Sequence, residues 1–188
     1  YNKNADNFAK TTINVDFYET QNRFSTLLPE HGYILDFGCG SGRDTKYFLE
    51  QGFYVDATDG SEEMCHIASN YTGIQVRRLL FEELDENKKY DGIWACSSIL
   101  HLPKNELKAV FMKMFKALKE DGIIYTSFKY GDFEGERNGR YFTDFTEKTF
   151  EEFVDEIDNL QLKEEWITGD VRPGRGEEKW LNVILQKN

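Results

Sequence analysis

The sequence predicts an α/β fold in which helices cover both faces of a mostly parallel sheet. Short apolar segments rich in β-branched and aromatic residues alternate with segments whose apolar residues recur at helical spacing. Such alternation is typical of parallel strands joined by right-handed crossovers. The last two apolar segments, 160–169 and 179–187, have only a short loop between them. These two segments are therefore expected to pair antiparallel.

The predicted elements follow one another in a regular order. Residues 1–28 are expected to form one or two helices ahead of the first strand. The first five strands are expected at 33–37, 53–58, 73–79, 91–97 and 122–128. Helices are expected at 43–51, 61–70, 105–119 and 146–158. Candidate helix caps and stops are Ser61, Asn105 and Thr146 at the starts, and Gly52 and the Asp121–Gly122 turn at the ends.

Length, charge and cysteine content limit the class of protein. The 188 residues are expected to form one domain, with 29–188 as its core and 1–28 as a helical cap or lid. The net charge of −11 repels phosphate backbones, which disfavours nucleic acid as a partner. No apolar run approaches the length of a membrane-spanning helix. Three scattered cysteines without CxxC spacing favour the cytoplasm over a disulfide framework or a zinc site.

A glycine-rich turn follows the first predicted strand, in the stretch "ILDFGCGSGRD". Gly38, Gly40 and Gly42 suggest that a ligand approaches this backbone closely, at the start of a helix. An acidic residue, Asp59, closes the second predicted strand, as in dinucleotide-binding folds. The GxGxxG pattern of those folds requires a third glycine where this chain has Arg43. A nicotinamide enzyme is therefore a poor match.

Four stretches together resemble another family. "LDFGCGSG" resembles the first motif of class I S-adenosylmethionine-dependent methyltransferases, "DATDGSEEM" their second motif and "DGIWACSSILHLP" their fourth. "LKEDGIIYTSF" is similar to their helix, turn and fifth strand. Within that family the chain resembles the small single-domain enzymes related to tellurite resistance. The resemblance implies a three-layer, doubly wound, Rossmann-like sheet of seven strands, mostly parallel, with an antiparallel last strand.

The resemblance also implies where S-adenosylmethionine would bind. Asp36, Gly38, Cys39 and Gly40 would line its amino-acid and ribose part, and Asp59 would accept the ribose hydroxyls. The adenine would lie between Gly60 and Met64 on one side and Phe81 and Glu82 on the other, with Glu83 as an alternative to Glu82. Cys96 would lie under the methionine portion. Asp59 could instead cap a helix, and Arg43 could either hold the cofactor carboxylate or be a solvated charge.

The methyl acceptor is expected at the carboxyl ends of the strands, where three loops emerge. These loops would form the acceptor mouth, and they carry His101, Tyr130, Arg137, Arg140, Arg172 and Arg175. Four arginines in so acidic a chain suggest an anionic acceptor, such as a carboxylate or phosphate. They could instead be solvated charges that Glu134, Glu136, Glu177 and Glu178 partly neutralise.

His101 is the candidate general base, because imidazole titrates near neutral pH. It could alternatively be a histidine hydrogen-bonded at a helix start. Aromatic residues of the leading segment, Tyr1, Phe8, Phe17 and Tyr18, could close over the mouth or pack on the sheet. No metal site is expected.

These features predict a methyltransferase that acts on a small molecule. The alternatives are a methyltransferase of nucleic acid or protein, and a cofactor-binding regulatory subunit without catalysis.

Overall fold

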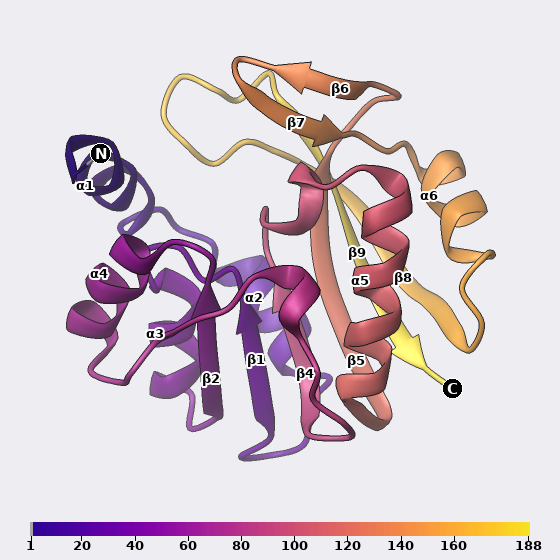
Figure 1. The fold of residues 1–188 in the computed structure, drawn as a ribbon, viewed down its shortest axis with the longest axis horizontal. Helices are drawn as coiled ribbons and strands as arrows, with labels where there is room; N and C mark the ends of the chain where they lie inside the picture. Colours follow the sequence, from indigo (N-terminus) through magenta and orange to yellow (C-terminus); the bar gives the residue numbers. More distant parts are fainter. Residues whose placement is uncertain (1) are drawn as a thin grey trace.

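The computed structural model describes residues 2–188, with side chains from residue 4 onward. Its main sheet has seven strands in the order β3-β2-β1-β4-β5-β9-β8 (Figure 1). The strands are β1 Tyr33–Phe37, β2 Tyr54–Asp59, β3 Arg77–Arg78, β4 Tyr90–Ala95, β5 Leu118–Lys129, β8 Leu160–Gly169 and β9 Lys179–Lys187. The pairs among β1 to β5 are parallel, and β9 runs antiparallel to both β5 and β8. The predicted α/β fold, with its antiparallel last strand, is confirmed.

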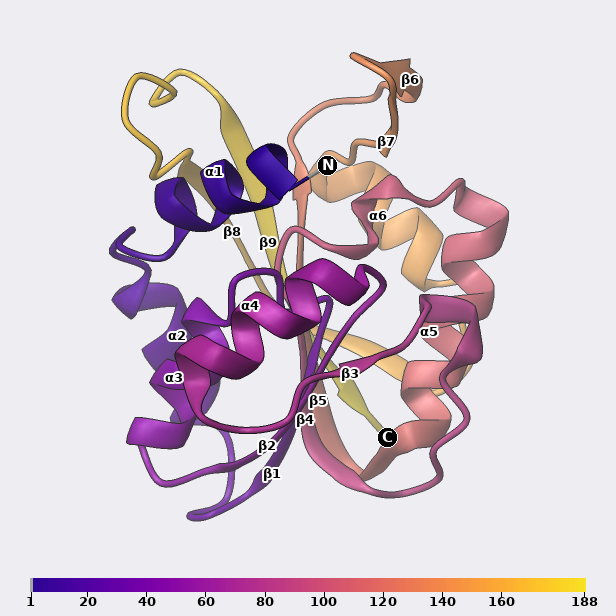
Figure 2. The same ribbon diagram turned by 60° about the vertical axis from the view of Figure 1, so that its left-hand side comes forward.

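Helices cover both faces of this sheet (Figure 2). One face carries α2 Tyr18–Ser25, α3 Arg43–Glu50 and α4 Glu62–Thr72, and the other carries α5 Lys104–Ala117 and α6 Glu147–Val154. A separate buried apolar cluster fills each side of the sheet, and Trp94 and Phe111 are central members of the two largest clusters. The first helix, α1 Asn2–Thr12, lies over the carboxyl edge of the sheet. In residues 2–188 no helix is both long and apolar enough to cross a membrane.

Two predicted helix starts are confirmed and one is wrong. The hydroxyls of Ser61 and Thr146 each accept a hydrogen bond from the main-chain N–H three residues later, at 3.3 Å. Asn105 caps nothing, because α5 begins one residue earlier and Pro103 precedes it. The preset φ of proline suits the entry into a helix. The third strand is also much shorter than the predicted range 73–79, because only Arg77 and Arg78 pair with β2, at the carboxyl end of β2.

The segment after β5 contains a hairpin that was expected to be a loop. Strands β6 Glu134–Arg137 and β7 Arg140–Thr143 pair antiparallel through the turn Asn138–Gly139. Both turn residues have positive φ, 53° and 76°, which right-twisted hairpins require. An Asn-Gly pair between such strands is a strong hairpin signal that the sequence analysis missed. The hairpin, α1 and the 170–178 loop lie over the same sheet edge (Figure 1).

Candidate active site

A cavity of about 470 Å³ opens at the carboxyl edge of the sheet. The glycine turn lines one part of it, through Gly38, Cys39 and Gly40. The β6–β7 hairpin, the 170–178 loop and β9 line another part. Four residues of the leading segment also line it: Phe8, Thr12, Val15 and Phe17. The cavity therefore joins the predicted cofactor turn to the predicted acceptor mouth.

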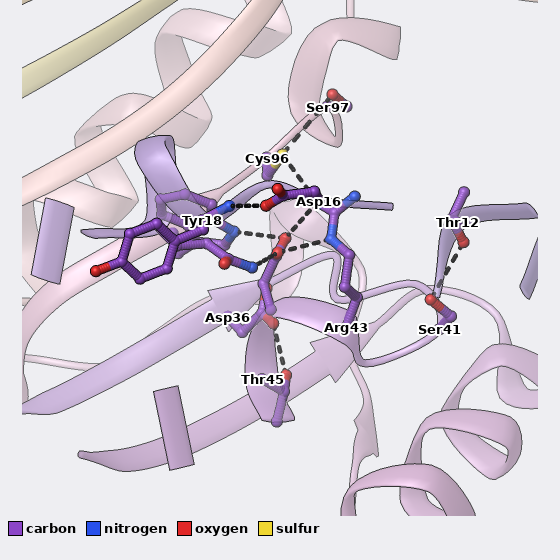
Figure 3. Close-up of polar contacts among 12 residues, drawn as sticks. Thr12, Asp16, Tyr18, Asp36, Ser41, Arg43, Thr45, Cys96 and Ser97 are labelled. Carbon is purple, nitrogen blue, oxygen red and sulfur yellow. Dashed lines mark hydrogen bonds and ion pairs between the residues drawn. The ribbon is translucent and has the colours of Figure 1, made fainter. Parts of the chain in front are cut away.

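The leading segment contacts the glycine turn directly. The Thr12 hydroxyl lies 3.2 Å from that of Ser41 (Figure 3). A Cβ atom on Gly40 would lie 3.4 Å from the Phe8 ring. Tyr18 points away from the cavity and packs edge-on against Tyr47. Tyr1, the remaining aromatic residue of the predicted lid, lies outside the described residues.

Two of the three glycines make room for side chains of the protein itself. A Cβ atom on Gly38 would lie 2.6 Å from Ser98 Cβ, and one on Gly42 would lie 2.7 Å from Thr72 Cγ2. Both residues also have left-handed φ, 83° and 85°, which glycine adopts without strain. Packing within the protein itself therefore accounts for Gly38 and Gly42, and the close approach of a ligand to this turn stays a prediction. Gly38 and Gly40 still line the cavity.

Asp59 ties the glycine turn to the start of α4. Its Oδ2 accepts from the main-chain N–H of Gly40 and its Oδ1 from that of Ser61, both at 2.9 Å. Burial raises the pKa of Asp59, and these two hydrogen bonds oppose the rise. Asp59 thus supports the helix start, as one of its two interpretations predicted, and it does not line the cavity. Its contact with ribose stays a prediction.

Buried acidic groups lie beneath the turn. Asp44 accepts from Arg43, Gln21 and Trp94. Burial opposes ionisation of Asp44, but Arg43 and the other donors keep its pKa below the ordinary value. Asp36 accepts from the Thr45 hydroxyl at 2.5 Å (Figure 3). Burial, reinforced by the charge of Asp44, raises the pKa of Asp36 to about 8.

The positions of Asp36 and Arg43 differ from those expected. Asp36 is 2% exposed and does not line the cavity, so the protein covers it. Arg43 lines the cavity but is held by Asp44, with its guanidinium carbon 4.6 Å from the centre of the Phe17 ring. Arg43 is therefore not a solvated charge, because Asp44 pairs with it. A contact between Arg43 and the cofactor carboxylate stays a prediction.

Two thiols, Cys39 and Cys96, line the cavity, and their contacts with the cofactor stay predictions. Burial raises the pKa of Cys96 to about 12 and that of Cys39 still further. Both groups therefore remain protonated near neutral pH and behave as small, weakly polar wall residues. Neither is a nucleophile in this state.

The residues expected around the adenine lie outside this cavity. Phe81 packs edge-on against Phe37, with ring centroids 4.9 Å apart, and Met64 is buried. A Cβ atom on Gly60 would approach a Leu80 methyl group. Glu82 is exposed, whereas Glu83 accepts from the N–H of Leu80 at 2.7 Å. Roles of Gly60, Met64, Phe81 and Glu82 in cofactor binding stay predictions.

All four predicted arginines line the cavity, and three of them have carboxylate partners. Arg137 pairs with Asp144 at 2.8 Å, Arg172 with Asp170 at 2.5 Å, and Arg175 with Glu178 at 3.9 Å. Burial opposes the ionisation of Asp170, but hydrogen bonds from Arg172 and Trp180 lower its pKa to about 2. Among residues 4–188, no carboxylate lies within ion-pair distance of Arg140. Carboxylates therefore neutralise part of the positive charge at the mouth. Of the four glutamates expected to do so, only Glu178 pairs with one of these arginines.

Tyr130 is placed away from the acceptor mouth. Its hydroxyl donates to Glu147 at 2.8 Å, and Tyr130 does not line the cavity. Tyr130 forms a β-bridge with Phe145, and its side chain reaches Glu147, the first residue of α6. The predicted role of Tyr130 in acceptor binding has no support in this arrangement.

His101 lines the cavity and its tautomer is defined by a neighbour. Its Nδ1 lies 2.8 Å from the main-chain carbonyl oxygen of Tyr141. A carbonyl only accepts, so Nδ1 carries the proton and Nε2 is left as an acceptor. Burial lowers the pKa of His101, the hydrogen bond to the Tyr141 carbonyl opposes this, and the charges of Arg140 and Lys129 add to the lowering. His101 is therefore neutral near pH 7, the state that a general base requires.

Further lining residues were not predicted. Lys129 at the end of β5 donates to Glu178 at 2.7 Å, and its Nζ lies 5.6 Å and 5.7 Å from the ring centroids of Phe142 and Trp180. Asn182 of β9 also lines the wall. The sequence predicts a loop around Phe142 and a structural strand that contains Trp180 and Asn182. Aromatic and amide side chains do not by themselves indicate a site. Only the order of the strands in the sheet shows that these residues lie at the cavity.

The residues present fit S-adenosylmethionine, the cofactor that the resemblance implies. Gly38, Gly40 and Asp44 line the cavity, and Asp59 lies behind the turn, where it accepts from the main-chain N–H of Gly40. Acidic groups of this kind suit a ligand that carries a sulfonium and an ammonium group. Within the described part of the chain, no group of three metal-ligating side chains is present.

Comparisons with known proteins agree with this arrangement. A family model described as "Methyltransferase domain" matches residues 34–122. YqeM of Bacillus subtilis (strain 168), whose name assigns it to the methyltransferases, is 34% identical over 116 residues. That match covers 56% of this chain and 47% of YqeM, so the chain spans about half the length of this relative.

Solved structures share the whole fold. The 1,6-didemethyltoxoflavin-N1-methyltransferase of Burkholderia thailandensis, solved with 1,6-didemethyltoxoflavin and S-adenosylhomocysteine bound, is 25% identical with a TM-score of 0.75. That match covers 90% of this chain and 77% of the other. A Methanosarcina mazei protein has a TM-score of 0.77 at 15% identity, over 92% and 99% of the two chains. The motif order, the sheet order and these matches together show that residues 34–122 match a methyltransferase domain and that the chain has the fold of the class I S-adenosylmethionine-dependent methyltransferases.

Proposed function

We propose that this chain transfers the methyl group of S-adenosylmethionine to a small, negatively charged acceptor. One observation carries the proposal: a single cavity is lined by the glycine turn, by His101 and by the arginine-bearing loops. A shared cavity lets a donor and an acceptor meet without crossing solvent. The relative that binds 1,6-didemethyltoxoflavin supports a small molecule as the acceptor. The wall formed by Phe142 and Trp180 suits a planar group.

The charges of the mouth support a negative acceptor. Lys129 and Arg175 share one carboxylate, Glu178. Arg140 is exposed and has no carboxylate within ion-pair distance in the described residues. Positive charge is therefore in excess at the mouth, although the whole chain carries a net charge of −11. Such a local excess attracts a small anion, whereas the overall charge repels a nucleic acid.

The protein has a limited chemical task in this reaction. S-adenosylmethionine supplies a methyl carbon that is activated by positive sulfur. The chain's residues align the acceptor and exclude water, which α1 favours by covering the glycine turn. If the acceptor atom carries a proton, Nε2 of His101 accepts it. The part of the leading segment that ends at Phe17 thus acts as a cap over the cavity, whereas α2 packs into the core through Phe24.

A two-stage experiment tests the proposal. Calorimetry first measures binding of S-adenosylhomocysteine to the purified chain. Isotopically labelled S-adenosylmethionine is then incubated with a panel of small metabolites, half of them anionic, and labelled products are identified by mass spectrometry. Labelling of an anionic metabolite is expected. Tight binding with no labelled product would indicate a cofactor-binding subunit, and labelling of RNA or protein alone would contradict a small acceptor.

The three free thiols are consistent with a cytoplasmic location, which we retain as part of this proposal.

A further inference from the structure

The β6–β7 hairpin holds the segment that carries His101. The Tyr141 carbonyl accepts from His101 Nδ1, and the Phe142 ring lies edge-on to the imidazole, with centroids 4.7 Å apart. The Thr143 hydroxyl donates to the carbonyl of Leu102 at 2.7 Å. Glu134 accepts from the N–H of Lys104 at 3.1 Å. The hairpin thus contacts His101 itself and the chain on its carboxyl side.

The same hairpin carries a cation that lacks a carboxylate partner. Arg140 is the first residue of β7, next to the Tyr141 carbonyl that orients His101. Arg140 and His101 line the same cavity, and within residues 4–188 no carboxylate lies within ion-pair distance of Arg140. An arginine in this state is available to a bound anion.

Other charged groups around His101 are already paired. Lys129 of β5 is held by Glu178, and Arg137 of β6 by Asp144. At the start of α5, Lys104 lies 3.7 Å from Glu134. The remaining charged groups of the mouth are Arg172, Arg175 and Asp170, in the 170–178 loop. Arg140 is therefore the charge near His101 that an acceptor can most readily offset.

We propose that the hairpin makes His101 responsive to the acceptor: a negatively charged group bound at Arg140 offsets the local positive charge and makes His101 a stronger base. The proposal rests on the proposed function, because it deepens the role of the same site. Positive charge near His101 disfavours its protonated form, so an anion beside Arg140 favours that form. The positive charges of Arg140 and Lys129 lower the pKa of His101, so an anion that offsets them would raise it.

The proton is accounted for in this scheme. The acceptor atom loses its proton to Nε2 of His101 as it gains the methyl group. The imidazolium so formed keeps its Nδ1–H bond to the Tyr141 carbonyl. The bound anion stabilises the new positive charge until the proton is released to solvent. His101 would thus gain basicity only while an acceptor is present.

Nuclear magnetic resonance tests this without any acceptor or cofactor. Ring ¹⁵N spectra of the labelled full chain give the tautomer of His101 and its titration midpoint. The probe is sodium sulfate, compared with sodium chloride at equal ionic strength. We expect the Nδ1–H tautomer in the neutral state, and a higher midpoint with sulfate than with chloride. His31 and His66, which lie outside the cavity, report any general effect of the salt.

Matched variants identify the cause. Arg140→Gln should raise the His101 midpoint in chloride and abolish the further rise with sulfate. Arg23→Gln, which alters an arginine that pairs with Glu164 away from the cavity, should behave like the wild type. Thr143→Val should weaken the support from the hairpin and produce a mixture of His101 tautomers, with the chain still folded.

Three results would overturn the proposal: an Nε2–H tautomer in the wild type, a midpoint that sulfate leaves unchanged, or the same sulfate effect in Arg140→Gln. None of them depends on methyl transfer. Failure of S-adenosylhomocysteine binding, measured separately, would overturn the proposed function and leave these spectra to be judged by themselves.

Discussion

The Asp59 carboxylate accepts a hydrogen bond from the main-chain N–H of Gly40, and this 2.9 Å contact joins the end of β2 to the glycine turn after β1. The other oxygen of the same carboxylate accepts from Ser61 at the start of α4. One acidic side chain therefore sets the relative positions of the turn and the helix that flank the predicted cofactor site. The two interpretations of Asp59, a helix support and a ligand contact, are compatible, because each carboxylate oxygen has a second lone pair.

Replacing Asp59 should weaken cofactor binding more than it weakens the fold. Loss of a charged acceptor costs about 1.5–3 kcal/mol, so Asp59→Ala should raise the dissociation constant of S-adenosylhomocysteine roughly 10- to 100-fold. Calorimetry measures the binding, and thermal unfolding measures the fold. Asp158→Ala, at an exposed position, is the control. Unchanged affinity in Asp59→Ala would remove Asp59 from the cofactor site.

Adding a methyl group at Gly38 should destabilise the protein through two separate effects. Gly38→Ala must adopt a left-handed φ, which costs about 1–2 kcal/mol, and its Cβ must also displace Ser98. Overpacking of this kind typically adds about 1–3 kcal/mol. Urea unfolding measures the sum.

Gly73→Ala separates these two effects. Gly73 has a similar φ of 79°, and a Cβ atom there would meet nothing within 4 Å. Gly73→Ala should therefore lower the free energy of unfolding only by the backbone strain, about 1–2 kcal/mol. Equal losses in the two variants would show that Ser98 yields without cost.

The stability of the protein should depend on pH through Asp36. Burial and the neighbouring Asp44 raise the pKa of Asp36 to about 8, above its unfolded value of 3.8. Between these two values the folded state binds the extra proton, so the free energy of unfolding decreases as pH rises toward 8. The slope for one group is at most about 1.4 kcal/mol per pH unit.

The Asp36→Asn variant isolates this contribution. An asparagine cannot ionise and still offers an oxygen to the Thr45 hydroxyl. The difference in unfolding free energy between variant and wild type should grow in favour of the variant from pH 5 to pH 8. Guanidinium unfolding at several pH values measures it. Parallel curves for the two proteins would show that Asp36 is ionised throughout this range.

Removing Asp44 should destabilise the protein much more than removing a partly exposed ion-pair partner. Asp44→Ala leaves the half-enclosed Arg43 guanidinium, Gln21 and Trp94 without their acceptor. Breaking a buried pair in this way costs about 3–5 kcal/mol. Glu164→Ala, which removes the partly exposed partner of Arg23, should cost about 0–1 kcal/mol. Denaturant unfolding followed by tryptophan fluorescence compares them, and similar losses would contradict the role assigned to Asp44.

Much of the fold was predictable because its signals are local. Apolar spacing located the strands and main helices, and Ser61 and Thr146 were recognised as caps from their own positions. The hairpin was equally local, and the Asn138–Gly139 pair would have identified it. The failure at Tyr130 was of another kind. Nothing in the neighbouring sequence shows that its hydroxyl reaches Glu147 instead of the mouth.

The amino-acid sequence by itself determined the order of strands and helices, the glycine turn after β1, the acidic residue at the end of β2 and the resemblance to the class I methyltransferases. Periodicity and turn chemistry act between residues a few positions apart, so they can be recognised in the chain alone. Tertiary structure decided which arginines are neutralised, which side chains fill the space beside Gly38 and Gly42, and which nitrogen of His101 carries the proton. Each of these depends on a contact between distant segments, such as His101 with Tyr141, that exists only once the crossovers have brought the loops to one edge of the sheet.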